Sequence, residues 1–250
     1  MAAAAVIGAS GRPLPLGRTI LVQLASSVAN RLAPGGIGGV ATNVRYLERS
    51  GLRRPEAMAA VALTTAAGFV VHALALASAA ALLSDADIQP IRLPRRWGLL
   101  VAIVAVTTLL GLVFWSPVGR RLLPQARQAA RSLLAVFQRP RQATLVFAGA
   151  AGVTAGYVLA LSFALRAFGA HPPLLYVAAA YLAGAAIGAA SPTPGGLGAV
   201  EAALVAALTR LDVPGGAAIA GVLSFRLVTY WLPIVAGVAA FHTLRRNGAL

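Results

Sequence analysis

The sequence contains no cysteine and no lysine, and each absence removes a group of functions. Without cysteine the chain has no disulfide, no thiolate nucleophile and no Cys-ligated metal. Without lysine it has no P-loop and no Schiff-base chemistry. The three histidines, His72, His171 and His242, have no metal-ligand spacing, and no catalytic triad, carboxylate pair or dinucleotide loop is visible. We therefore expect a protein that is not an enzyme and that uses no cofactor and no metal.

Charge is also scarce. Only 11% of the 250 residues are charged and 59% are hydrophobic, whereas a soluble domain is about one quarter charged. This composition excludes an ordinary soluble enzyme, a disordered chain and a coiled coil. The 21 basic residues are all arginine and give a net charge of +15. In so apolar a chain, this excess favours loops at an anionic membrane face over nucleic-acid binding. We expect membrane lipids with anionic headgroups as partners and no nucleic acid, with a homo-oligomer or a membrane-protein partner left open.

Long stretches without charged residues predict helices that cross a membrane. About 20 apolar residues span the hydrocarbon core as a helix, which satisfies its own backbone groups. Spans are predicted near 58–83, 97–116, 142–165 and 217–244. The shorter stretches 14–33 and 174–190 either cross the membrane or re-enter it. The expected fold class is an all-α polytopic transmembrane helix bundle, with residues 1–250 as a single membrane domain.

Two finer patterns concern helix packing and the membrane surface. Gly184 and Gly188, like Gly152 and Gly156, are four residues apart, a spacing that lets helices approach closely, although glycine is simply frequent here. The stretch 116–141 carries six arginines and no acid, interleaved with apolar residues. It fits either an amphipathic helix on the inner leaflet or a solvated basic loop.

An internal repeat at an offset of 160 residues is the most informative pattern. Pro-Gly-Gly-x-Gly-x-Val occurs at 34–40 and again at 194–200. Each copy predicts a short helix, a break, a second short helix (37–49 and 197–209) and a long span, so the repeats cover about 14–83 and 174–243. Proline and glycine favour such breaks, which at membrane depth require burial or a wet cavity. Repeated broken helices point to a transporter's binding site, and the alternative is a pair of ordinary loops.

The distribution of arginines predicts the orientation of the repeats. If both broken elements are re-entrant, most arginines fall on one side, which the positive-inside rule makes cytoplasmic. The span 58–83 then runs outward and the span 217–244 runs inward, so the repeats are inverted. The segment 120–141 and the tail after Leu244 would share the cytoplasmic side. We also expect the two Pro-Gly-Gly breaks to face each other near the bilayer midplane.

The residues of the second repeat resemble a known family. Ser191-Pro-Thr-Pro-Gly-Gly-Leu-Gly-Ala-Val-Glu201 and Ser224-Phe-Arg-Leu-Val-Thr-Tyr-Trp-Leu-Pro233 are similar to the lysylphosphatidylglycerol synthase transmembrane-region family of flippase-like membrane proteins. The segment 30–39 resembles the N-terminal counterpart, and the resemblance covers about 10–245. The best-known members flip aminoacylated phosphatidylglycerol, and some carry a C-terminal synthase domain. The resemblance therefore implies a translocase in the bacterial inner membrane, in a short form without the synthase domain. Residues 1–9 are apolar and have no basic region before them, so they look like the tail of a helix rather than a signal peptide. Family members usually carry one or two more helices at the N-terminus.

The polar residues near the breaks are the candidates for a binding site. Arg226 lies inside the last span, where an unpaired charge costs about 2.5–3.5 kcal/mol on insertion scales, and Glu201 is its expected partner. The two form either a headgroup site, with Arg226 for phosphate and Glu201 for an amine or as a gate, or a structural pair in which Glu201 caps a helix. Arg31 either contacts phosphate or extends to the inner surface. The candidate substrate-binding residues are Arg31, Pro34, Gly35, Gly36, Thr193, Pro194, Gly195, Gly196, Glu201, Arg226 and Tyr230.

Three functions are compatible with these observations. The leading interpretation is a flippase-like translocase for a phospholipid or lipid-linked headgroup. The first alternative is a non-catalytic membrane partner or anchor protein. The second is a membrane enzyme acting on lipid headgroups, which requires a cluster of acids at one interface, and only Asp85 and Asp87 come close.

Overall fold

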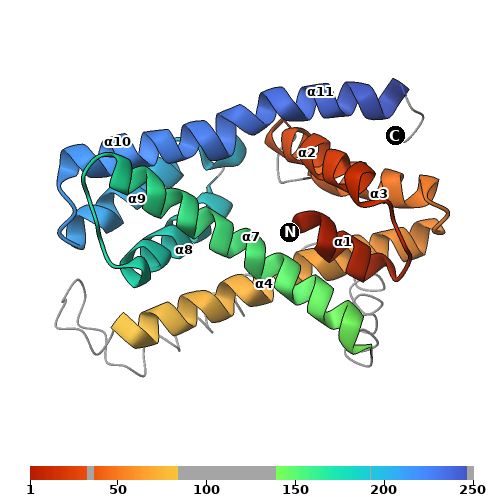
Figure 1. Cartoon of the computed structure of the whole chain (residues 1–250), viewed down its shortest axis with the longest axis horizontal. Coiled ribbons are helices and arrows are strands. Elements are labelled where there is room, and N and C mark those ends of the chain that lie inside the picture. The colour runs from red at the N-terminus through yellow and green to blue at the C-terminus, as the bar shows by residue number, and fades with distance from the viewer. Residues whose placement is uncertain (33–36, 84–138, 192, 247–250) are drawn as a thin grey trace.

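The structure is a computed structural model of the chain, and it describes residues 1–32, 37–83, 139–191 and 193–246. All regular elements in these ranges are helices (Figure 1). In chain order they are α1 (Ala2–Ser10), α2 (Leu16–Leu32), α3 (Ile37–Arg49), α4 (Arg54–Leu83), α7 (Pro140–Ala167), α8 (Leu174–Ala190), η2 (Pro194–Gly196), α9 (Ala199–Arg210), α10 (Gly215–Arg226), η3 (Leu227–Trp231) and α11 (Leu232–Arg246).

Three helices are long and apolar enough to cross a membrane: Arg54–Leu83, Pro140–Ala167 and Gly215–Arg246. They confirm the spans predicted near 58–83, 142–165 and 217–244. The span 97–116 and nearly all of the basic segment 116–141 lie outside the described residues. The chain is therefore a multi-pass membrane protein with an all-helical fold.

The long helices set the frame of the molecule. In Figure 1 the continuous helix α10–α11 lies along the top, α4 lies along the bottom, and α7 crosses between them in contact with both. The chain runs from right to left in α4 and from left to right in α10–α11, so these two helices have opposite directions. At one end α9 packs against α10 and α8 packs against α9; at the other end α2 packs against α11 and α3 packs against α2.

Two buried clusters hold these groups of helices together. Leu161, Leu165, Val177, Leu204 and Val222 belong to a core shared by α7, α8, α9 and α10. A second core joins α1, α2, α3, α4 and the end of α11; its members include Val6, Val22, Tyr46, Leu47, Ala57 and Leu244. The outward face of α10–α11 is apolar but exposed, as expected for a face that contacts lipid rather than protein.

Among the described residues, the helices that surround the second break follow the same order as those that surround the first. Helices α2, α3 and α4 correspond to α8, α9 and α10–α11, about 160 residues later. The predicted short helix 37–49 is confirmed, whereas its counterpart begins at Ala199 rather than at residue 197. The reason is that Gly195, Gly196 and Gly198 have φ values of 63°, 67° and 82°, which a right-handed helix does not contain.

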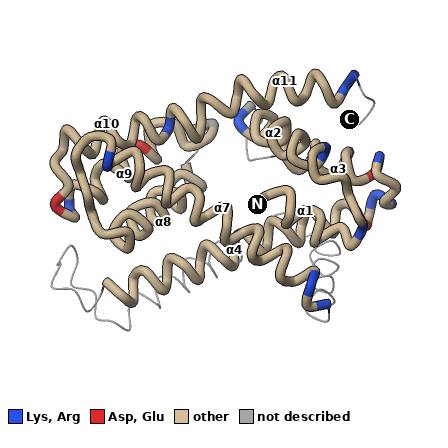
Figure 2. The backbone as a smooth tube through the Cα atoms, viewed as in Figure 1, with Lys and Arg blue, Asp and Glu red and all other residues tan. Residues whose placement is uncertain are grey.

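Charged residues gather at the ends of the helices (Figure 2). At the start of α4, Arg53 bonds Glu56 at 2.5 Å, and Arg54 lies 3.8 Å from Glu48. The hydrogen bond to Glu56 raises the pKa of the Arg53 guanidinium. The start of α7 and the end of α11, which carry Arg139, Arg141, Arg245 and Arg246, lie toward the same end.

Glycines allow close helix contacts, but not all of those predicted. Gly184 and Gly188 of α8 lie against Leu204 and Val200 of α9, which confirms that pair. On α7 only Gly152 of the expected pair has a close contact among the described residues, with Met1, and Gly149 contacts Ala5. Helix α1 thus packs on the face of α7 that carries residues 149 and 152, and no described atom lies within 4 Å of a Cβ added at Gly156.

We expect Gly188→Val to lower the thermal stability of the protein in detergent. A Cβ atom at residue 188 falls on the Cγ2 methyl of Val200, so α8 and α9 must separate. Overpacking of this kind costs about 1–3 kcal/mol. The matched control is Gly156→Val, in the apolar helix α7, where no described atom lies within 4 Å of the added Cβ. Equal shifts of the melting temperature for both variants would show that the α8–α9 contact is not tightly packed.

Candidate functional site

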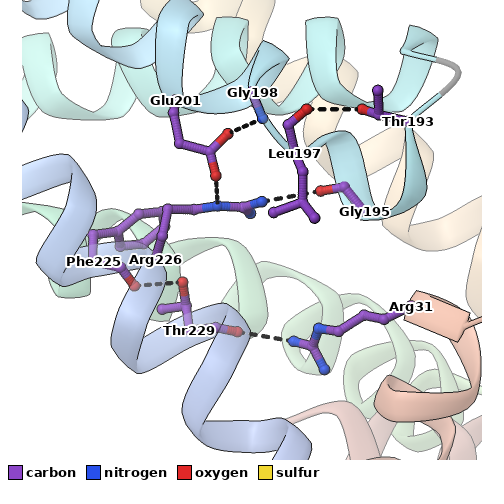
Figure 3. Close-up of polar contacts among 9 residues, drawn as sticks. All are labelled: Arg31, Thr193, Gly195, Leu197, Gly198, Glu201, Phe225, Arg226 and Thr229. Atoms are coloured by element: carbon purple, nitrogen blue, oxygen red, sulfur yellow. Dashed lines mark hydrogen bonds and ion pairs between the residues drawn. The ribbon is translucent and has the colours of Figure 1, made fainter.

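An ion pair lies at the end of α10. The Nε of Arg226 donates to Oε1 of Glu201 at 2.6 Å, and the two side chains are 11% and 21% exposed. The Nη2 of Arg226 also donates to the carbonyl of Gly195 at 3.1 Å (Figure 3). The expected pairing of Arg226 with Glu201 is therefore confirmed.

Glu201 has a second role at the start of α9. Its Oε2 accepts a hydrogen bond from the backbone N–H of Gly198, the N-cap residue, at 2.8 Å (Figure 3). A carboxylate in the first turn of a helix satisfies one of the free N–H groups there and interacts favourably with the helix dipole. Glu201 thus caps α9 and pairs with Arg226 at the same time, so it fills both of the structural roles expected for it.

A π-helical turn, η3 (Leu227–Trp231), directly follows Arg226. Its cause lies in the sequence, because Pro233 has no N–H and cannot bond the carbonyl of Thr229 four residues earlier. That carbonyl instead accepts a hydrogen bond from Nη2 of Arg31 at 2.9 Å (Figure 3). Such turns within α-helices occur frequently at functional sites. Sequence reasoning missed Thr229, although a proline inside an apolar span was the signal for it.

The guanidinium of Arg31 forms its hydrogen bonds with protein atoms of α2 and η3. Its Nη1 donates to the hydroxyl of Ser27 at 3.0 Å, and its Nη2 reaches Thr229, 198 residues away in sequence. Both partners lie next to the end of α2, so the half-buried guanidinium forms its hydrogen bonds close to its own helix. Arg31 therefore joins the first half of the chain to the second.

Tyr230 is the point where the two arginines meet. The Cζ atoms of Arg31 and Arg226 lie 4.9 and 4.5 Å from the centroid of its ring. Tyr230 is only 7% exposed, and a cation over the face of a partly desolvated tyrosine is stabilised by the ring. Arg226 and Tyr157 also lie within electrostatic reach of Arg31. We call Arg31, Glu201, Arg226 and Tyr230 the double-arginine site.

The break between α8 and α9 forms one wall of this site. Gly195 packs directly against the ring of Tyr230, and Gly196 packs against Gly188 and Val200. The hydroxyl of Thr193 contacts Ser191 at 2.8 Å and donates to the carbonyl of Leu197 at 3.0 Å, so it shapes the break rather than meeting either arginine. Pro194 begins the 3₁₀ turn.

The first break lies outside the described residues. Pro34, Gly35 and Gly36 belong to 33–36, so the expectation that the two breaks face each other stays a prediction. The structure does place η2 in contact with α2, whose last turn carries Arg31.

The double-arginine site lies within a membrane-length helix, away from both of its ends. Gly215–Arg246 has 32 residues, and Arg226 is about 17 Å from its start at a rise of 1.5 Å per residue. Elsewhere in the described residues, charge is concentrated at helix ends (Figure 2). Charged groups at such depth are costly, and they face protein or water and mark binding or transport pathways.

The described residues offer no metal chemistry. No group of three or more His, Cys, Asp and Glu side chains converges in them. His72 bonds the carbonyl of Leu182 through Nε2 at 3.1 Å and so links α4 to α8. The arrangement is suited instead to binding an anion, because two guanidiniums share one site with a single carboxylate.

These elements define a polytopic α-helical membrane protein with a charged site within one of its membrane-length helices. The family model of the lysylphosphatidylglycerol synthase TM region matches residues 2–237, so the chain belongs to that family, and the resemblance seen in the sequence is confirmed. The matched region takes up nearly the whole sequence. No curated protein matches the chain.

Proposed function

We propose that this protein is a flippase-like translocase that moves a phospholipid or lipid-linked headgroup across the bacterial inner membrane. One observation carries the proposal: guanidiniums from the two halves of the chain, Arg31 and Arg226, meet on Tyr230 within a membrane-length helix. Translocation requires a site inside the membrane at which a phosphate can be bound at a low cost in free energy. Family membership supports the same function.

The guanidiniums have donors left for a phosphate. Arg226 uses Nε and Nη2, and Arg31 uses one N–H on each of Nη1 and Nη2, in the described residues. A guanidinium carries five N–H donors, so each retains at least two. Arginine binds phosphate through two parallel hydrogen bonds, which makes it well suited to this ligand.

The proposal includes inverted repeats with re-entrant helix pairs. The repeated helix order and the opposite directions of α4 and α10–α11 support the inversion. In each pair, α2 with α3 and α8 with α9, the first helix would enter the membrane and the second would return to the same side. Broken helices of this kind surround the binding site in many transporters, and a rocking of one repeat against the other exposes the site alternately.

We expect single cysteines to report this topology, because the chain has none of its own. Arg12→Cys and Arg54→Cys flank the first pair of short helices and should be labelled by an impermeant maleimide from the cytoplasmic side. His171→Cys and Asp212→Cys flank the second pair and should be labelled from the opposite side. Ser191→Cys, at the break between α8 and α9, should not be labelled from the cytoplasm. Cytoplasmic labelling of Ser191→Cys would show that α8 crosses the membrane completely.

Reconstitution in liposomes tests the translocase itself. Fluorescent phosphatidylglycerol is placed in both leaflets, and external dithionite reduces only the label in the outer leaflet. The wild-type protein should move the lipid of the inner leaflet outward, so that dithionite reduces this pool as well. Arg31→Gln removes one of the two charges and should slow this exchange about tenfold, corresponding to a loss of about 1.4 kcal/mol. The control is Arg166→Gln, an exposed arginine at the end of α7. No exchange by the folded wild-type protein would favour a non-catalytic membrane partner instead.

A further inference from the structure

We infer that Tyr157 of α7 is a further binding residue of the double-arginine site, where its hydroxyl donates a hydrogen bond to the lipid phosphate, and that Tyr181 of α8 positions it. This inference rests on the proposed translocase function. The sequence pattern does not indicate either tyrosine, since both lie in apolar helices away from the Pro-Gly-Gly elements. Their role follows from contacts that only the folded chain provides.

Three aromatic rings from three helices form a cluster beside the site. The rings of Tyr157 and Tyr181 are stacked, with their centroids 5.6 Å apart and their planes 11° from parallel. Both rings meet the ring of Phe225 edge to face, at 6.3 and 6.2 Å. Phe225 directly precedes Arg226 in α10 and is only 3% exposed. The cluster is therefore anchored to the helix that supplies one of the two arginines.

The same cluster is linked to the other arginine through η3. The carbonyl of Phe225 accepts a hydrogen bond from the hydroxyl of Thr229 at 2.7 Å, and the carbonyl of Thr229 accepts one from Arg31 at 2.9 Å (Figure 3). Tyr157 also lies within electrostatic reach of Arg31, as Tyr230 does. Helix α7 thus adds a side chain to a site whose other members come from α2, α9, α10 and η3.

The hydroxyl of Tyr157 is available to a ligand. It forms no hydrogen bond within the part of the chain that the structure describes, and no fully buried side-chain oxygen or nitrogen there lacks a partner. The hydroxyl of this half-buried residue therefore reaches accessible space and not the packed core. A phosphate oxygen between Tyr157 and Arg31 can accept a hydrogen bond from each of them.

Stacking prepares Tyr157 for this role. A ring held by Tyr181 and Phe225 is already ordered, so less side-chain freedom is lost when a ligand binds. The hydroxyl is neutral, so it adds a donor for the phosphate whatever charge the rest of the headgroup carries. The recognised chemistry is the phosphate that glycerophospholipids, their aminoacylated forms and polyprenyl carriers share.

Lipid binding to the purified full-length protein, measured by native mass spectrometry, tests the hydroxyl. Tyr157→Phe removes one oxygen and keeps the ring, so it should bind phosphatidylglycerol about tenfold more weakly, as expected for a lost hydrogen bond to a charged group. Binding of diacylglycerol with the same acyl chains, which has no phosphate, should not change, and neither should the melting temperature. Polyprenyl phosphate and the free polyprenol form a second pair. A loss confined to this pair would support the inference and identify a carrier lipid as the source of the phosphate.

Two variants of Tyr181 separate positioning from direct binding. Tyr181→Phe keeps the stacked ring and should bind phosphatidylglycerol as the wild type does, whereas Tyr181→Leu removes the stack and should lose affinity as Tyr157→Phe does. The matched control is Tyr176→Phe, near the start of the same helix α8. It should change neither binding nor stability.

Two results would overturn the inference: unchanged binding of both phosphate lipids by Tyr157→Phe, or an equal loss for the lipids with and without phosphate. Neither result depends on whether Tyr181→Leu folds. Exchange in liposomes by the wild type, together with unchanged binding by Tyr157→Phe, defeats only this inference. A phosphate-dependent loss of binding without any exchange by the wild type defeats only the translocase function.

Discussion

Arg226→Ala is expected to destabilise the protein by about 3–5 kcal/mol, because it leaves Glu201 largely buried without its 2.6 Å partner. Glu201→Gln strands the arginine in turn, but it retains an oxygen that can accept from Gly198 and cap α9. The double variant Arg226→Ala/Glu201→Gln removes both charges, so we expect it to regain most of the lost stability. Transport should not return, because the double-arginine site then has only Arg31.

Thermal unfolding in detergent, followed for the wild type, both single variants and the double variant, measures this coupling. A double variant clearly more stable than the sum of the single effects predicts indicates a directly interacting pair. Additive losses would mean that Glu201 and Arg226 contribute independently, despite the hydrogen bond between them. Lipid exchange measured on the same four proteins separates stability from function.

Gly195→Ala is expected to abolish transport and to lower stability. Gly195 has a φ of 63°, which is strained for a residue with a side chain, and its added Cβ would overlap Cε2 of Tyr230. The ring must move, and with it the surface on which Arg31 and Arg226 lie. Backbone strain of this kind costs about 1–3 kcal/mol, and the displacement of Tyr230 adds to it.

The matched control for that variant is Gly169→Ala. Gly169 also has a positive φ, 78°, but it lies in the turn after α7 and has nothing within 4 Å of an added Cβ. It should lose stability through strain alone and retain lipid exchange once folded. If the two variants lose transport equally, the contact between Gly195 and Tyr230 is not what the site needs.

The spans and the central ion pair could be predicted from sequence, because their causes are local. Three helices follow from apolar runs near 58–83, 142–165 and 217–244. The Glu201–Arg226 pair follows from the cost of one arginine inside a span with a single acid nearby. The break between α8 and α9 follows from Pro194-Gly195-Gly196, since glycine and proline specify backbone geometry directly.

The rest depends on tertiary packing, which no local pattern encodes. The bond from Arg31 to Thr229 joins residues 198 positions apart, and it requires α2 to lie beside η3. Pro233 indicates that a carbonyl is free but not which donor will reach it. Likewise, the spacing of Gly152 and Gly156 shows that a helix could approach there, but it does not show which helix: α1 contacts Gly152 and Gly149, and no described atom contacts a Cβ added at Gly156. Two glycines at the same spacing on α8 do meet a partner helix.

The central claim is that a lipid phosphate occupies the double-arginine site, and cross-linking tests it most directly. Phosphatidylglycerol with a photoactivatable group on its headgroup can be incorporated with the protein into nanodiscs, irradiated, and the adducts mapped by mass spectrometry. The account predicts adducts on the peptides that contain Arg31 and Tyr230, with loss of both in Arg31→Gln. Adducts confined to outward-facing residues of α11, such as Val235 and Val238, and unchanged in Arg31→Gln would contradict it.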